Sequence, residues 1–240
     1  MTTLCLDFGN TRLKAAIFQN DSFYKEINLT DDNTETIASL ITEYAPQKSI
    51  LASVVHHNPE IETLLADKTR FHKISNETKK NFSIAVSKPD TIGPDRIALI
   101  AAAVHFHSGK NNLIIGVGSC ITYNFVDQNN CFLGGAISPG MDMRFRAMHE
   151  FTAKLPLTQA DWNFPLIGYD TKTNLQSGVI TGILGEMEGF TARYGEKYGN
   201  FNTILTGGNA SYFASQLKSR IFADVNFLFK GMYVLSEINN

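Results

Sequence analysis

The stretch LCLDFGNTRLKAAIF, residues 4–18, decides how the rest of the chain is interpreted. An apolar strand stops at Asp7, turns at Gly9, and leaves as a second strand that carries Lys14. Gly-Asn is a good two-residue hairpin turn because glycine tolerates a positive φ, so an ordinary hairpin is one interpretation. The alternative is a phosphate cradle, which needs backbone N–H groups, amide and hydroxyl donors, a carboxylate for Mg²⁺ and a lysine.

Residues 113–120 repeat the pattern of residues 4–11: three apolar residues, a variable one, an apolar one, a glycine and a small polar residue. Each copy continues into a second apolar strand, so the likeness covers a strand-turn-strand unit. The second turn offers Ser119 and backbone N–H groups, but Gly116 stands where the first copy has a carboxylate. Two similar half-chains would place the two turns on opposite walls of a cleft, although glycine turns between apolar strands are also common by chance.

The bulk composition argues against several classes of function. The 240 residues contain 21 Lys and Arg and 23 Asp and Glu, a net charge of −2, so we expect neither nucleic acid nor a membrane as a partner. Three cysteines without CxxC spacing suggest neither a disulfide framework nor a zinc site. With no signal-peptide pattern or bilayer-length apolar run, we expect a soluble cytoplasmic protein.

Periodicity predicts an α/β protein with mixed sheets. The predicted strands cover residues 3–7, 12–18, 23–27, 49–55, 113–115, 120–126, 132–138, 202–205 and 225–229. The predicted helices cover residues 34–44, 95–106, 141–151, 174–198 and 211–218.

Gly93, Pro94, Asp95 and Arg96 open the helix predicted over residues 95–106. Proline and an acidic residue in the first turn are ordinary start signals, which is the structural interpretation. In the functional interpretation the helix dipole keeps Asp95 ionised with a low pKa, so that it accepts a proton from a substrate hydroxyl while Arg96 binds an anionic group. The glycine-rich residues 133–140 and 204–209 are consistent with close backbone packing or with approach of a ligand.

Taken together, these pieces resemble the superfamily of acetate and sugar kinases, heat-shock chaperone ATPases and actin, and within it the type III pantothenate kinases. The likeness spans nearly the whole chain, in the family's order: Asp7-Phe8-Gly9-Asn10-Thr11-Arg12-Leu13-Lys14, Gly93-Pro94-Asp95-Arg96, Gly118-Ser119-Cys120-Ile121-Thr122, Gly134-Gly135-Ala136-Ile137-Ser138-Pro139-Gly140, Thr152-Ala153-Lys154-Leu155-Pro156, Thr171 with Ser177-Gly178, and Thr206-Gly207-Gly208.

The resemblance implies two similar ribonuclease-H-like, actin-like ATPase subdomains around a central cleft, which we place at residues 1–110 and 111–240. It also implies ATP-dependent phosphorylation of pantothenate at its primary hydroxyl, the first step of coenzyme A biosynthesis. Mg²⁺, a monovalent cation (K⁺ or NH₄⁺) and a homodimer are expected with it.

Family roles carry over by position. The catalytic base is Asp95, and Asp7 holds Mg²⁺ through water. The expected ATP contacts are Asp7, Gly9, Asn10, Thr11, Arg12, Lys14 and Ser119. The expected pantothenate contacts are Gly93, Pro94, Asp95, Arg96 and Thr171.

Three positions depart from the family pattern: Gly116 replaces the aspartate that binds the monovalent cation, Asn124 replaces an aspartate in the next strand, and Val86 replaces a tyrosine near the substrate. Loss of a carboxylate weakens the electrostatic basis for cation binding. Two other functions therefore stay open: a relative that binds nucleotide or pantothenate as a regulatory protein, and a kinase for another small alcohol.

Overall fold

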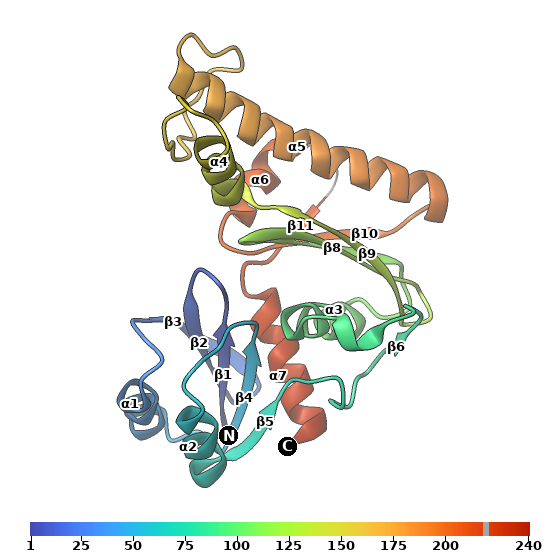
Figure 1. Cartoon of the computed structure of the whole chain (residues 1–240). Helices are drawn as coiled ribbons and strands as arrows, with labels where there is room; N and C mark the ends of the chain where they lie inside the picture. The colour runs from blue at the N-terminus through green and yellow to red at the C-terminus, as the bar shows by residue number, and fades with distance from the viewer. Residues whose placement is uncertain (218–220) are drawn as a thin grey trace. The chain divides into compact units, whose positions relative to one another are not determined.

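The computed structural model describes residues 1–217 and 221–240. It confirms the α/β prediction, with two sheets flanked by helices (Figure 1). The elements, in chain order, are β1 (Thr2–Phe8), β2 (Leu13–Gln19), β3 (Ser22–Leu29), α1 (Thr34–Tyr44), β4 (Lys48–Ser53), α2 (Glu60–Lys68), β5 (Arg70–Lys73), β6 (Ser83–Ile84), the 3₁₀ helix η1 (Pro89–Thr91), α3 (Pro94–Phe106), β7 (Asn112–Val117), β8 (Cys120–Val126), β9 (Cys131–Pro139), α4 (Met141–Glu150), α5 (Thr171–Tyr198), β10 (Asn202–Thr206), α6 (Ala210–Gln216), β11 (Ile221–Ala223) and α7 (Phe227–Asn239).

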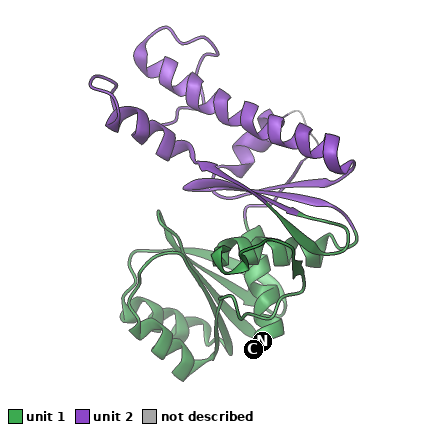
Figure 2. Cartoon of the chain, turned by 45° about the vertical axis from the view of Figure 1, so that its right-hand side comes forward, with its two compact units in different colours: residues 1–109, 126–134, 226–240 green, residues 110–125, 135–225 purple. Residues whose placement is uncertain are grey.

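The chain divides into two compact units (Figure 2). Unit 1 comprises residues 1–109, 126–134 and 226–240. Unit 2 comprises residues 110–125 and 135–225. The first and last described elements, β1 and α7, therefore belong to the same unit.

The sheet of unit 1 has five strands in the order β3-β2-β1-β4-β5. Strands β1, β2 and β3 form an antiparallel meander, while β4 and β5 run parallel to β1. A parallel strand needs a crossover connection, and α1 and α2 provide the two crossovers. As a result β1 and β4 end at the same edge, where the β1–β2 loop also lies.

Helices cover both faces of this sheet. Leu4, Leu6 and Phe8 alternate along β1 and bury their side chains with those of α1 and α2. The opposite face packs against α3 and α7, which also contact each other. At their crossing a Cβ on Gly231 would lie 1.8 Å from the carbonyl oxygen of Ala98, so only glycine permits this approach.

The second sheet has the order β11-β10-β7-β8-β9-β6. In unit 2, β10 runs parallel to both β7 and β11. Apolar residues on one face of β7 and β8 form a core with α4, α5 and α6. This core includes Ile115 of β7, Tyr123 of β8 and Ile183 of α5. Within unit 1, β6 pairs with the first two residues of β9.

Most predicted elements are present, but one is wrong. Residues 225–229, predicted as a strand, include the start of helix α7. Phe227 and Phe229 are buried there, and a short, all-apolar run does not distinguish a strand from a buried helix. The predicted helix over residues 211–218 corresponds to α6, and its last residue lies outside the described residues. The prediction did not include α2, β5, β6, η1 or β11.

None of the helices in residues 1–217 and 221–240 is both long enough and apolar enough to cross a bilayer.

Candidate active site

The first loop joins β1 to β2 in unit 1. Phe8 pairs with Leu13, so the connection is the four residues Gly9-Asn10-Thr11-Arg12, and the predicted two-residue turn is wrong. The Gly9 N–H donates to the carbonyl oxygen of Arg12 at 3.1 Å, which closes the loop. Gly9 does not have a positive φ. A Cβ there would lie 3.3 Å from the Arg12 carbonyl oxygen, a tight contact that glycine avoids.

Lys14 lies opposite Asp7 in the β1–β2 register. Its Nζ forms an ion pair with Glu26 Oε1 of β3 at 2.6 Å. Both side chains are partly exposed, so this pair contributes little stability but fixes where the ammonium group lies. Sequence analysis missed Glu26, because only the antiparallel pairing of β2 with β3 brings it beside Lys14.

Asp7 is a half-buried carboxylate at the end of β1. Burial raises its pKa to about 7, and the negative charges of Asp95 and Glu26 act in the same direction, while Lys14 opposes them. Unit 1 therefore brings together three residues predicted from sequence, namely Asp7, Lys14 and Asp95. A half-buried carboxylate whose pKa is raised in this way is typical of functional sites.

Asp95 lies in the first turn of α3, directly after Pro94, and Gly93 is the N-cap. Its carboxylate folds back toward Gly93, where a Cβ would lie only 2.5 Å from Oδ1. Burial raises the pKa of Asp95, whereas hydrogen bonds from the backbone N–H groups of Arg96 and of Asp95 itself, and the Arg96 charge, lower it. The expectation of a low pKa is wrong, because desolvation outweighs the helix N-terminus.

Arg96 is held by an aromatic ring that sequence analysis did not identify. Its guanidinium carbon lies 5.6 Å from the centre of the Phe132 ring, in a cation–π contact within unit 1. Phe132 is buried, so the planar guanidinium has a fixed support.

The second loop, in unit 2, is the two-residue connection Gly118-Ser119 between β7 and β8. The Gly140 N–H donates to the carbonyl oxygen of Ser119 at 3.0 Å. A Cβ on Gly140 would lie 2.3 Å from the Gly118 carbonyl oxygen, so the glycine-rich stretch does pack closely on this loop. Likewise, Gly207 has φ +106° and a Cβ there would lie 2.2 Å from the Val117 carbonyl oxygen.

The position of the expected monovalent cation ligand offers few oxygen atoms. Gly116 pairs with Thr206 of β10, whose buried hydroxyl has no hydrogen-bond partner among the described residues. Asn124 is fully buried, and its amide donates to the Ile114 carbonyl oxygen at 3.4 Å and to Thr122 Oγ1 at 3.2 Å. These two replacements leave no carboxylate at either position.

Thr171 is the first residue of α5, after the N-cap Asp170. A capping box with Thr173 starts the helix three residues earlier than predicted from apolar periodicity. Thr171 lines a cavity of about 320 Å³ in unit 2, together with Met148, Leu155, Asn174, Leu175 and Gly178.

A larger cavity of about 730 Å³ lies in unit 1 beside the first loop. Its lining residues are Gly9, Asn10, Thr11, Arg12, Leu13, Asn28, Leu29, Thr30, Asp32, Val55, His56 and His57. The three predicted loop residues Asn10, Thr11 and Arg12 are exposed. The volume of this cavity is within the range of sites that bind small molecules.

Comparison with known proteins identifies the family. The type III pantothenate kinase family model matches residues 3–193. A type III pantothenate kinase of Christiangramia forsetii is 40% identical over 238 residues, which is 98% of this chain and 98% of the relative.

Two solved structures support the fold alone, since both are under 25% identical. A protein described as a Baf family transcriptional activator from Campylobacter jejuni has a TM-score of 0.62 at 21% identity, covering 98% of each chain. A glucokinase from an Antarctic psychrotroph has a TM-score of 0.50 at 10% identity, covering 99% of each chain. Both likenesses agree with an α/β fold of two mixed sheets flanked by helices.

The family match covers most of the chain and the curated relative is similar from end to end, so the chain belongs to the type III pantothenate kinase family, phosphotransferases that phosphorylate pantothenate in coenzyme A biosynthesis.

Proposed function

We propose that Asp95 is the catalytic base of this reaction and that the first loop, with Asp7 and Lys14, binds the phosphates of ATP. The observation that carries this proposal is the Asp95 carboxylate, folded over Gly93 in the first turn of α3 and close enough to raise the pKa of Asp7. A base and a phosphate loop in one unit can hold an acceptor hydroxyl against the γ-phosphate.

In the proposed step, the primary hydroxyl oxygen of pantothenate forms a bond to the γ-phosphorus, and the bond from that phosphorus to the β–γ bridging oxygen breaks. The hydroxyl proton passes to Asp95, and ADP leaves with the electron pair of the broken bond. Because phosphoryl transfer has a loose transition state, orientation of the hydroxyl matters most. The raised pKa of Asp95 additionally makes it a stronger base than an exposed aspartate.

The residues present fit Mg²⁺ bound with ATP. Asp7 supplies a carboxylate that would hold the ion through water, and its pKa is raised to about 7 chiefly by burial and then by the negative charge of Asp95. When bound, the ion would neutralise charge on the transferred phosphoryl group. Lys14, oriented by Glu26, would complete the first loop, and Ser119 is the proposed ATP contact in unit 2.

Pantothenate carries one carboxylate, and we assign its recognition to Arg96, with Gly93, Pro94 and Thr171 as further contacts. Arg96 supports this assignment because its guanidinium rests on the Phe132 ring at a fixed distance of 5.6 Å from the ring centre. A supported planar guanidinium binds a carboxylate with little loss of side-chain freedom.

We propose that the monovalent cation site expected for the family is weak in this chain. Gly116 provides no side-chain oxygen, and the Thr206 hydroxyl beside it is a neutral ligand. A carboxylate would supply the charge that these groups lack.

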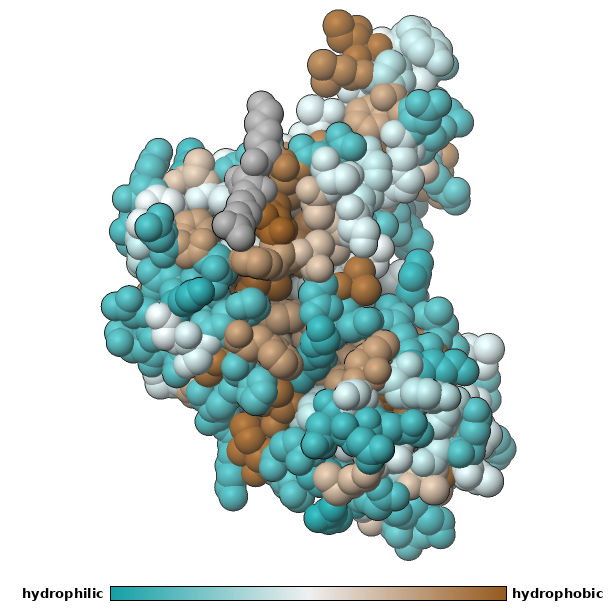
Figure 3. All heavy atoms as spheres, turned by 180° about the vertical axis from the view of Figure 1, so that it is seen from behind, coloured by the Kyte–Doolittle hydropathy of each residue, from teal (hydrophilic) through white to brown (hydrophobic). Residues whose placement is uncertain are grey.

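We also propose a homodimer formed through the segment between α4 and α5. Its large apolar side chains are unusually exposed: Phe151 (88%), Ile167 (85%), Tyr169 (81%) and Leu166 (73%). Figure 3 shows hydrophobic residues at the surface of the end of unit 2 that carries this segment. Apolar groups gathered in this way mark interaction sites, and a second copy is the occupant that the proposed family dimer supplies.

Two further assignments complete the proposal. The two actin-like subdomains remain a proposal at residues 1–110 and 111–240, and the compact units differ from them in that unit 1 also includes residues 126–134 and 226–240. The cytoplasm is the proposed location, supported by the three free cysteines Cys5, Cys120 and Cys131.

The test is a coupled ATP assay on the wild type and on Asp95→Asn. We expect the variant to lose roughly 10²-fold or more in kcat, with pantothenate binding retained by calorimetry. No pantothenate-dependent turnover in the wild type, or equal turnover in the variant, would refute the assignment of Asp95.

Gly116 and Asn124 favour one alternative, a relative that binds its ligands without catalysis. Calorimetry that detects pantothenate and ATP binding while no product forms would support it. A panel of small alcohols in the same assay tests the other alternative: faster turnover of another alcohol than of pantothenate would identify a kinase with a different acceptor.

A further inference from the structure

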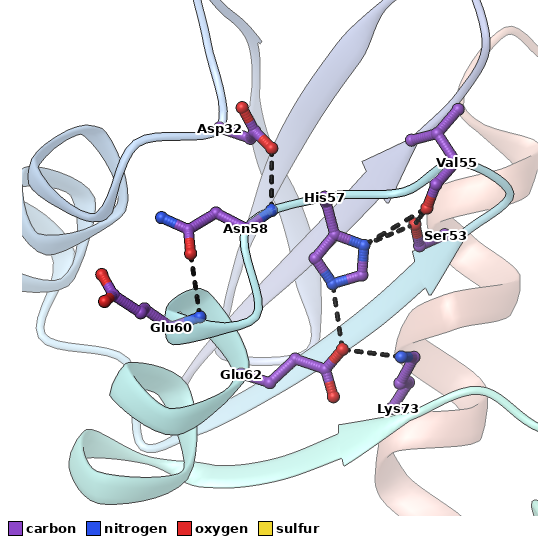
Figure 4. A network of polar contacts seen from close by, with 8 residues as sticks. All are labelled: Asp32, Ser53, Val55, His57, Asn58, Glu60, Glu62 and Lys73. Atoms are coloured by element: carbon purple, nitrogen blue, oxygen red, sulfur yellow. Dashed lines mark hydrogen bonds and ion pairs between the residues drawn. The ribbon is translucent and has the colours of Figure 1, made fainter.

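The residues that follow β4 form a tightly tied segment in unit 1 (Figure 4). At its start, the Ser53 hydroxyl donates to the Val55 carbonyl oxygen at 2.9 Å. At its end, the Asn58 N–H donates to Asp32 Oδ2 at 2.9 Å, and the Asn58 side chain accepts from the Glu60 N–H at 3.0 Å. The backbone of residues 53–58 is thus anchored at both ends.

His57 occupies the centre of this segment, with polar partners on both ring nitrogens (Figure 4). Nε2 lies 2.9 Å from Glu62 Oε1, and Nδ1 lies 2.9 Å from Ser53 Oγ. Nε2 faces a carboxylate oxygen, to which it donates, and the single Ser53 hydroxyl proton is placed between the Val55 carbonyl oxygen and Nδ1, each 2.9 Å from Oγ. Glu62 is in turn paired with Lys73 Nζ at 2.6 Å.

These partners fix the ring in one orientation, and only 7% of the His57 side chain is exposed. In that orientation the ring meets Phe8 edge-on, with the centroids 5.3 Å apart and the planes at 75°. The Val54 N–H also donates to the Phe8 carbonyl oxygen at 3.0 Å. Phe8 is therefore held by its ring and by its backbone from the same segment.

Phe8 is the last residue of β1, immediately before Gly9 of the first loop. Side chains alternate along a strand, so Phe8 and its neighbour Asp7 point to opposite faces of the sheet. His57 consequently supports the base of the loop from the face that Asp7 does not use. The segment and the loop also line the same cavity, the segment through Val55 and His57 and the loop through Gly9 and Arg12.

We propose that His57 is a positioning residue for ATP: held by Ser53 and Glu62, it supports Phe8 and so sets the geometry of the first phosphate loop. This inference rests on the proposed role of that loop in binding ATP. His57 itself touches no reacting atom. Removing the His57 ring takes away its edge-on contact with the Phe8 ring and leaves Glu62 paired only with Lys73 of its two cationic or imidazole partners. The first loop would then no longer be held in the geometry that binds phosphate.

The test measures ATP affinity on the full chain, by calorimetry with a non-hydrolysable ATP analogue and Mg²⁺ and by steady-state kinetics. We expect His57→Ala to raise KM for ATP and the analogue Kd about tenfold, with kcat and KM for pantothenate within about threefold of wild type. In His57→Gln an amide N–H can replace Nε2–H as a donor to Glu62, so we expect recovery to within about threefold of the wild-type KM for ATP.

His72→Ala is the matched control. His72 is a partly buried histidine of β5 in the same unit, with Nε2 2.8 Å from Thr78 Oγ1, and it does not line the cavity. The His72→Ala variant should have a lower melting temperature than wild type, as His57→Ala should, but its KM for ATP should stay within twofold of the wild-type value. If His57→Ala does not fold, Ser53→Ala carries the test and should raise KM for ATP at least threefold.

Lys14→Ala separates the inference from the function on which it rests. If Lys14→Ala weakens ATP binding but the His57 and Ser53 variants behave like His72→Ala, the positioning role is overturned and the loop assignment stands. If Lys14→Ala leaves ATP affinity unchanged, the loop is not the phosphate site and both assignments fall.

Discussion

Asp7 and Asp95 come from different elements of unit 1, yet the charge of Asp95 adds to the burial that raises the pKa of Asp7 to about 7. Near neutral pH the unliganded protein therefore exchanges a proton at Asp7. A divalent cation must displace that proton, so Mg²⁺-ATP binding should release protons to the buffer. Two further predictions concern these two carboxylates, and two more concern residues of unit 2.

Gly93→Ala should act through Asp95. Alanine tolerates the Gly93 backbone, with φ −61° and ψ 146°, but its Cβ would lie 2.5 Å from Asp95 Oδ1 and would displace the carboxylate. We expect kcat to fall at least tenfold, with a small change in melting temperature. Gly185→Ala is the control, because a Cβ at this position in α5 meets nothing within 4 Å and should leave activity unchanged. Equal kcat in wild type and Gly93→Ala would show that the carboxylate position does not limit the reaction.

Asp7→Asn should change how stability depends on pH. The folded protein retains the Asp7 proton up to about pH 7, whereas an unfolded chain loses it near pH 4, so this group lowers the unfolding free energy as pH rises between these values. The variant lacks this penalty and should be more stable than wild type at pH 8, by about 1 to 3 kcal/mol, with the difference shrinking at pH 5.

Urea unfolding of the ligand-free protein at pH 5 and pH 8 measures this effect. Asp90→Asn, at an exposed aspartate of η1, controls for a general change in charge. A difference between Asp7→Asn and wild type that is the same at both pH values would contradict the assigned pKa.

Monovalent cations should have little influence on the wild type. Because Gly116 and Asn124 supply no carboxylate, we expect turnover in K⁺ and Na⁺ buffers to agree within about twofold. Gly116→Asp should restore a preference for one cation, visible both in turnover and in the melting temperature. A clear K⁺ requirement in the wild type would mean that other oxygen atoms bind the ion.

Ile167→Glu should disrupt the proposed dimer. Ile167 is 85% exposed, so a charge there costs an isolated chain little but would be buried without a partner in an interface. Sedimentation should give twice the chain mass for wild type and the single chain mass for Ile167→Glu. Tyr24→Glu, at a 58% exposed tyrosine of β3, should remain dimeric. A monomeric wild type would remove the basis for an interface here.

The fold could be predicted well where local patterns act alone. Residues 34–44 and 120–126 match α1 and β8, because their apolar spacing and flanking turns agree. The pattern was ambiguous at α7, whose first residues read equally well as a buried strand. Capping chemistry, visible in Asp170 and Thr173, would have located the start of α5 more accurately than periodicity did.

The candidate site could be predicted only in part. Asp7, Lys14 and Asp95 follow from motifs, but Glu26 and His57 depend on pairing between strands and helices that are distant in sequence. The prediction that Asp95 has a low pKa was wrong for a similar reason. The helix N-terminus is visible in the sequence, whereas the burial that outweighs it appears only when α3 is packed.

The contact between Gly231 and Ala98 joins two segments of unit 1 that are far apart in the chain. It joins α7 to α3 across all of unit 2, and closing so long a loop costs about 2 kcal/mol more in chain entropy than closing a loop of roughly ten residues. In sequence, unit 2 is inserted between the two joined segments. A lesion confined to α7 would therefore disturb the packing of the unit that holds Asp7 and Asp95, although α7 contributes no residue to the proposed site.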